Sequence, residues 1–192
     1  MRFFNTTGPV NPEDHYCLPP LERWDLEEVL SLIEQKRYFV LHAPRQTGKT
    51  SGLLALSEYL NQRGEFRALY ANIEAAQAAR EDLAMGMSTI VHTLGSDAAF
   101  YLKDSSAVEL AREVRASTPA ASMLEEFLSR WRLQSPLPTV LMLDEVDSLV
   151  GDTLISLLRQ LRAGYNKRPA AFPQSVILCG VRDVRDYRIY SS

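Results

Sequence analysis

The most constraining feature of this 192-residue chain is an eight-residue segment that joins two different hydrophobic patterns. The segment reads Ala43-Pro44-Arg45-Gln46-Thr47-Gly48-Lys49-Thr50. Before it, residues 38–41 form a continuous apolar run, which is typical of a strand buried on both faces. After it, residues 49–60 place leucines at helical spacing, and Asn61 and Gly64 end that pattern. The sequence therefore predicts a buried strand, a tight loop and a helix in immediate succession.

A loop in this setting is suited to binding phosphate, because backbone N–H groups of the loop and of the helix N-terminus converge on an anion. Gly48 lets the backbone approach phosphates, Lys49 can bridge the β- and γ-phosphates, and the Thr50 hydroxyl can ligate Mg²⁺. The segment matches the pattern GxxxxGK[ST] except at its first position, where alanine stands for glycine. The expected nucleotide-binding residues are Ala43, Pro44, Arg45, Gln46, Thr47, Gly48, Lys49, Thr50 and Ser51.

A second apolar run, residues 139–143, ends directly in two carboxylates, Asp144 and Glu145. The carboxyl ends of parallel strands line the crevice in which α/β sheets bind their ligands. Asp144 is placed to hold Mg²⁺, directly or through water, and Glu145 to orient or deprotonate an attacking water. We therefore expect Thr50 and Asp144 at the metal, with Glu145 and Lys49 in catalysis.

The remaining hydrophobic pattern alternates between strands and helices. Two further strands are predicted at 66–73 and 175–179, and helices are predicted at 25–36, 75–94, 106–115, 118–132 and 152–164. This alternation favours a layered α/β domain with a mainly parallel sheet and helices on both faces. The helical material between the second and third strands exceeds what one crossover needs, so we expect a helical insertion there.

Composition limits the class of protein. With 46% hydrophobic residues and a net charge of −3, the chain is expected to form one globular domain rather than to be disordered. The charge does not by itself imply a nucleic-acid partner, nor does it exclude one. Cys17 and Cys179 lie far apart and are interpreted as reduced thiols of a cytoplasmic protein. No apolar stretch approaches the roughly 20 residues of a membrane helix, so no membrane association is expected.

Residues 43–50 resemble a Walker A motif, and residues 140–145 resemble a Walker B motif of the additional-strand, catalytic-glutamate P-loop NTPases. The strand at 66–73, which lies between the two motifs in the chain, fits that division. Within it the chain resembles AAA+-type and AAA-like bacterial ATPases, including STAND-related ones, over roughly residues 20 to 183. The resemblance implies a three-layer P-loop NTPase that binds ATP and hydrolyses it with Mg²⁺.

The resemblance also implies a domain organisation. Residues 1–23 form an irregular, proline-rich lead-in whose end, near residues 16–23, would line the adenine pocket. Residues 24–192 form the ATPase core. Members of the family continue with a fifth strand and a helical lid, whereas this chain stops soon after the fourth strand, so we expect either a fragment or a reduced member.

The family places a polar sensor residue at the tip of the fourth strand, and residues 175–179 end without the usual Asn or Thr. Arg182 or Arg185 is the expected replacement, acting either within the chain or across a subunit interface. The expected partners are therefore ATP and either a second copy of the chain or another protein. Two other functions stay open: a nucleotide-gated switch with little hydrolysis, and, less favoured, a P-loop small-molecule kinase. No Asn-Lys-x-Asp motif reads the base, so the sequence does not distinguish ATP from GTP.

Overall fold

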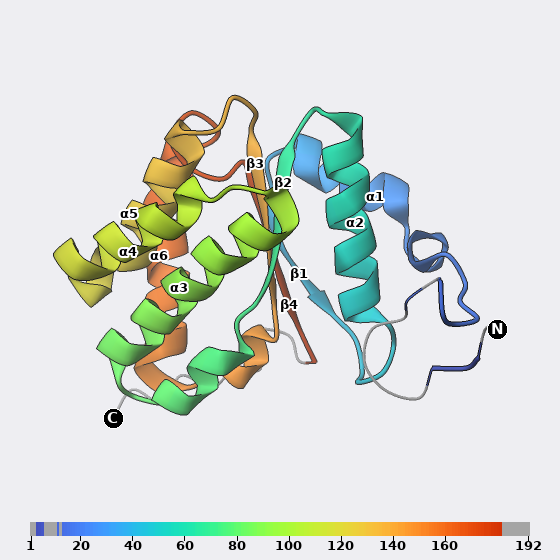
Figure 1. Cartoon of the computed structure of the whole chain (residues 1–192), viewed down its shortest axis with the longest axis horizontal. Coiled ribbons are helices and arrows are strands. Elements are labelled where there is room, and N and C mark those ends of the chain that lie inside the picture. Colours follow the sequence, from blue (N-terminus) through green and yellow to red (C-terminus); the bar gives the residue numbers. More distant parts are fainter. Residues whose placement is uncertain (1–2, 6–10, 12, 182–192) are drawn as a thin grey trace.

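Four parallel strands form the centre of the computed structural model, which describes residues 3–5, 11 and 13–181 (Figure 1). Their spatial order is β1-β4-β3-β2. The strands are β1 (Tyr38–His42), β2 (Arg67–Asn72), β3 (Thr139–Asp144) and β4 (Ser175–Gly180). All four were expected from the sequence, and no end of a strand differs from its predicted position by more than one residue.

The two motif strands do not pair with each other, because β4 lies between β1 and β3. The strand that stands between the motifs in the chain is β2, and it pairs with β3 alone, at the edge of the described sheet. The strand that separates β1 from β3 in space is therefore β4, which comes last among the described strands. The strand β2, which lies between the two motifs in the sequence, does not lie between them in the sheet.

Helices cover both faces of the sheet (Figure 1). One face carries α1 (Leu26–Glu34) and α2 (Lys49–Arg63). The other carries α3 (Leu83–Leu102), α5 (Ala120–Leu133) and α6 (Gly151–Gly164), while α4 (Ser106–Ser117) packs on α3 and α5. Short 3-10 turns complete the described elements: η1 (Pro20–Arg23), η2 (Glu74–Ala79), η3 (Val146–Ser148) and η4 (Tyr165–Lys167). The expected insertion between the second and third strands is therefore α3, α4 and α5.

Two helix boundaries differ from the predictions for local reasons. The helix predicted at 75–94 is split into η2 and α3, because Arg80 adopts a positive φ of 48° and Asp82 then caps α3 by accepting the N–H of Met85. The helix predicted at 118–132 begins at Ala120, since Thr118 is extended and closes α4 while Pro119 precedes α5.

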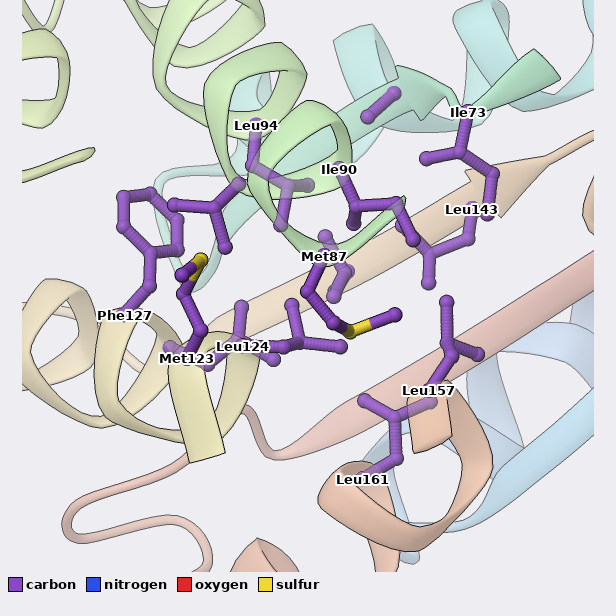
Figure 2. Close-up of a cluster of buried hydrophobic side chains, with 14 of the residues drawn as sticks. Ile73, Met87, Ile90, Leu94, Met123, Leu124, Phe127, Leu143, Leu157 and Leu161 are labelled. Atoms are coloured by element: carbon purple, nitrogen blue, oxygen red, sulfur yellow. The ribbon is translucent and has the colours of Figure 1, made fainter. Parts of the chain in front are cut away.

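Alternation along the strands separates the core into two clusters. On β3, Val140 and Met142 pack with α1 and α2, whereas Leu141 and Leu143 pack with the helices of the opposite face. Figure 2 shows the second, larger cluster, in which side chains of α3, α5 and α6 meet Leu143. Because both faces are covered, every residue of β3 is buried, including the acidic residue that ends it. In the described part of the chain, no helix is both long and apolar enough to cross a membrane.

Truncation of Phe127, a fully buried ring of α5, tests this core. We expect Phe127→Ala to lower the free energy of unfolding by about 3–5 kcal/mol, because it removes a large side chain and leaves a cavity. Leu133→Ala in the same helix is the matched control, since that side chain is 66% exposed. Urea unfolding measures both, and equal losses in the two variants would contradict the assignment of Phe127 to the core.

Candidate functional site

The loop between β1 and α2 is built around a left-handed glycine. Gly48 has φ 82° and ψ 21°, a conformation that other residues rarely adopt, and its carbonyl accepts the N–H of Gly52 at 2.9 Å. A side chain at position 48 would also lie 3.2 Å from Nη1 of Arg23. α2 then begins at Lys49, so its N-terminal N–H groups, which have no partners within the helix, face the loop.

The ammonium group of Lys49 bridges two carbonyl groups of this loop. Its ammonium donates to the carbonyl oxygens of Ala43 and Pro44, at 2.9 and 3.0 Å. The Thr47 hydroxyl donates to the same Pro44 carbonyl at 2.8 Å. The loop thus curls around one ammonium group, and an anion that enters it meets both this charge and the helix N-terminus.

The carboxylate of Asp144 is fully buried and surrounded by donors. Its Oδ2 accepts the Thr50 hydroxyl at 2.7 Å and the Tyr70 hydroxyl at 3.1 Å, and its Oδ1 accepts the backbone N–H of Glu145 at 3.0 Å. The Cys179 thiol of β4 lies near this carboxylate, and burial, followed by the charge of Asp144, raises the pKa of that thiol. A buried charge is tolerated when it is paired in this way.

Glu145 is held in an unusual backbone conformation beside the same site. Its φ of 59° and ψ of 36° lie in the left-handed region, which is uncommon for a residue with a side chain. Burial raises the pKa of its carboxyl, and neighbouring Asp144 and Asp147 add to this, while Lys49 acts in the opposite direction. A carboxylate with a raised pKa is a stronger proton acceptor.

A cavity of about 350 Å³ brings the predicted residues together. It is lined by Arg45, Gln46, Gly48, Lys49, Thr50, Ser51, Glu74, Glu145 and Val181. The phosphate loop and the acidic end of β3 therefore face one space, although they are about a hundred residues apart in the chain. Glu74, at the start of η2, is the lining carboxylate that sequence analysis missed, because nothing in its local pattern distinguishes it from a surface residue.

The lead-in packs against the other side of the loop. Tyr16, Leu18 and Trp24 line a cavity of about 190 Å³ together with Thr47 and Gly48. Arg23 and Trp24 also line a neighbouring cavity of about 400 Å³ that reaches Ala43 and Lys49. Residues of the 16–23 segment therefore line cavities beside the phosphate loop, and their role in an adenine pocket stays a prediction.

The chain is similar to known proteins in both sequence and fold. A family model described as an AAA domain matches residues 33–187. The chain belongs to this AAA domain family. Among solved structures, it is similar to a chain of a Drosophila ORC structure described as bound to poly(dA/dT) DNA and Cdc6, with a TM-score of 0.52 and 16% identity. The match covers 87% of this chain and 25% of that chain, so it speaks for the fold. No curated protein matches the chain.

The AAA domain family and the fold together make this chain a P-loop NTPase of AAA type. Its relation to bacterial and STAND-related members stays a prediction. Two predicted site residues of this AAA domain, Arg182 and Arg185, lie outside the described residues. At the tip of β4, Val181 donates its N–H to Asp147 at 3.0 Å, so the described part of this tip is tied to η3.

The metal expected in an AAA domain fits the donors at this site. Mg²⁺ usually keeps several waters and takes one or two protein oxygens beside the phosphates of its nucleotide. Oxygens of Thr50 and Asp144, 2.7 Å apart, are donors of that kind. Among the described residues, no group of three or more His, Cys, Asp or Glu side chains could hold a metal ion alone. Thr50 and Asp144 would therefore hold Mg²⁺ only together with the nucleotide.

Asp97 of α3 gives this AAA domain a pH dependence that can be measured. Burial raises its pKa from 3.8 to about 6, although the backbone N–H of Asn72 stabilises the charged form. The folded state therefore binds a proton more tightly than the unfolded state. Stability from this group is present at low pH and is lost as the pH rises from about 4 to about 6.

We expect Asp97→Asn to remove that loss, raising the free energy of unfolding above pH 6 by about 1 kcal/mol after allowance for partial solvent exposure. At pH 4 the variant and the wild type should be nearly equal. Thermal unfolding at pH 4 and pH 7.5 measures this, with Asp152→Asn, an exposed carboxylate of α6, as the control. A stability difference that is the same at both pH values would contradict the raised pKa.

Proposed function

We propose that this AAA domain binds ATP with Mg²⁺ and hydrolyses it. The observation that carries the proposal is the 2.7 Å hydrogen bond from Thr50 to Asp144. It joins the first turn after the phosphate loop to the acidic end of β3, as a shared metal site requires. Glu145 and Lys49 line the same cavity, which supports a catalytic site rather than a phosphate-binding loop alone.

Binding is assigned to the loop. Backbone N–H groups of residues 43–51, except Pro44, which has none, would surround the phosphates, and Lys49 would exchange its carbonyl partners for the β- and γ-phosphate oxygens. Thr50 and Asp144 would hold Mg²⁺, which when bound neutralises charge that develops on the phosphates. Residues 16–23 of the lead-in would receive the base.

Hydrolysis is assigned to Glu145. Its carboxylate would accept a proton from a water molecule while the water oxygen attacks the γ-phosphorus and the bond to the ADP oxygen breaks. The raised pKa of Glu145 suits this role, because the carboxylate then holds the proton more readily. The protein's further contribution is positioning, since the left-handed backbone of Glu145 fixes where its side chain begins.

A nucleotide-gated switch with little hydrolysis is the second candidate, and the tip of β4 favours it. Cys179 is buried and Gly180 has no side chain, so among the described residues the tip of β4 carries no Asn or Thr to read the γ-phosphate. Arg182 and Arg185 stay the proposed sensors or arginine fingers. If these arginines act on a neighbouring copy of the chain, turnover per subunit should rise as the protein concentration rises.

The remaining assignments are proposals of the same kind. We propose a second copy of the chain or another protein as the macromolecular partner, and a cytoplasmic location. The structural similarity to a chain of a DNA-bound complex supports a DNA partner, whereas the net charge of −3 gives no further support for one. We also propose that the chain divides into a lead-in at 1–23 and an ATPase core at 24–192.

Lys49→Ala tests binding. We expect ATP affinity to fall roughly tenfold to a hundredfold, because a charge-assisted contact contributes about 1.5–3 kcal/mol. Isothermal titration calorimetry with ATP, and with GTP for comparison, measures the effect. Lys167→Ala is the control, since this exposed lysine pairs with Glu125 and lines none of the loop cavities. Unchanged affinity in Lys49→Ala would refute the nucleotide site.

Glu145→Gln separates the ATPase from the switch. It keeps size and hydrogen bonding but removes the base, so phosphate release should fall about 10²–10⁴-fold while ATP affinity stays close to that of the wild type. Asp144→Asn should lose Mg²⁺-dependent affinity as well. Glu74→Gln, in the same cavity, is the control and should keep most turnover.

Phosphate release and calorimetry together decide between the candidates. A wild type that binds ATP without releasing phosphate, even when concentrated, would establish the switch. Full turnover in Glu145→Gln would show that another group activates the water.

A further inference from the structure

Tyr70 on β2 belongs to the site although no motif includes it. Its ring is 5% exposed and packs in the apolar cluster that faces α1 and α2. A phenylalanine would fill this position without bringing a polar atom into the core. The hydroxyl instead lies 3.1 Å from Oδ2 of Asp144, the oxygen that also accepts Thr50.

The register of the sheet explains how this contact forms. Asn72 is the partner of Asp144 across β2 and β3, and Met142 is the partner of Tyr70. Residues two apart on a strand share a face, so Tyr70 and Asp144 point to the same side of the sheet. The long phenol reaches diagonally along this face to the carboxylate, which a shorter hydroxyl on β2 would not reach.

The donors around Asp144 fix its orientation. A carboxylate held by one donor can turn about its terminal bond, because that torsion is broad. Here Thr50 from α2 and Tyr70 from β2 meet Oδ2, while the N–H of Glu145 holds Oδ1. Thr50 and the N–H of Glu145 belong to segments that carry predicted site residues, whereas Tyr70 comes from the neighbouring strand β2.

Tyr70 is itself held in place. The ring of Tyr101 from α3 meets it edge to face, with 5.7 Å between ring centroids. A tyrosine phenol is protonated at neutral pH, so this hydroxyl acts as a donor.

We propose that Tyr70 is a positioning residue for Mg²⁺: its hydroxyl orients Asp144 and so sets the Mg²⁺ dependence of nucleotide binding. The inference rests on the proposed function, because it assumes that Asp144 serves a nucleotide-bound metal. Groups that orient a metal ligand without touching the metal commonly change metal affinity by about 10–100-fold. A hydroxyl that only satisfied a buried carboxylate would affect stability and not this dependence.

Tyr70→Phe tests the proposal, because it removes the hydroxyl and keeps the ring. Binding of ATP is measured by calorimetry in EDTA and across a Mg²⁺ titration. We expect the Mg²⁺ concentration for half-maximal enhancement of ATP affinity to rise about tenfold, while affinity in EDTA stays within twofold of the wild type. In an Asp144→Asn background, Tyr70→Phe should cause no further change.

Tyr38→Phe is the matched control. This strand tyrosine is half-buried and its hydroxyl donates to the carbonyl of Pro173 at 3.3 Å, but it begins β1, at the opposite edge of the sheet from β2. Its removal should leave the Mg²⁺ titration unchanged. Thermal unfolding of every variant establishes that each is folded at the temperature of the binding measurement.

Three outcomes overturn the proposal and identify which assumption failed. A wild-type Mg²⁺ titration in Tyr70→Phe, beside a Mg²⁺-dependent wild type, removes the role of Tyr70 and leaves the proposed function intact. An equal loss of affinity with and without Mg²⁺ reduces Tyr70 to a structural residue. A wild type whose ATP binding ignores Mg²⁺ removes the proposed metal site and this inference with it.

Discussion

The hydrogen bond between Thr50 and Asp144 is the contact on which the rest of the structure depends. It links residues 94 positions apart, and it forms only if β3 is buried on both faces and α2 packs against the sheet beside it. A buried carboxylate is costly unless donors surround it, and here α2, β2 and the turn after β3 each supply one. The packing of the layers and the chemistry of the site are therefore one requirement.

Glu145 has other carboxylates among its neighbours. Burial raises the pKa of Glu145 most, Asp144, Asp147 and Glu74 raise it further, and Lys49 is the cation that acts against them. Such crowding of carboxylates is unfavourable unless a cation compensates it, which is the physical reason to expect a metal–nucleotide complex here. The same crowding prepares Glu145 to accept a proton. A site with this charge balance is suited to a ligand that brings both phosphate and a divalent cation.

Local patterns predicted much of this arrangement, because strands, loop and helix caps depend on neighbouring residues. The four apolar runs became the four strands, and Gly48, Lys49 and Thr50 line one cavity with Glu145, while the roles assigned to these residues stay predictions. Contacts set by sheet order and register could not be predicted in this way. Tyr70 stands in an apolar run like any core aromatic, and Cys179 meets Asp144 only because β4 inserts beside β3. The backbone reversal at Arg80, which splits a predicted helix, likewise has no glycine to announce it.

The two-residue repeat of the strands divides the protein into a chemical side and a structural side. Asp144, Tyr70 and Cys179 lie on the side of the sheet that α1 and α2 cover, and α2 is the helix that carries Thr50. The helical insertion packs on the opposite face, and Tyr101 of α3 contacts Tyr70 at the edge of the sheet. Helices α3, α4 and α5 can therefore diverge in length and surface among relatives, and acquire new binding partners, while the residues that hold the metal keep their places.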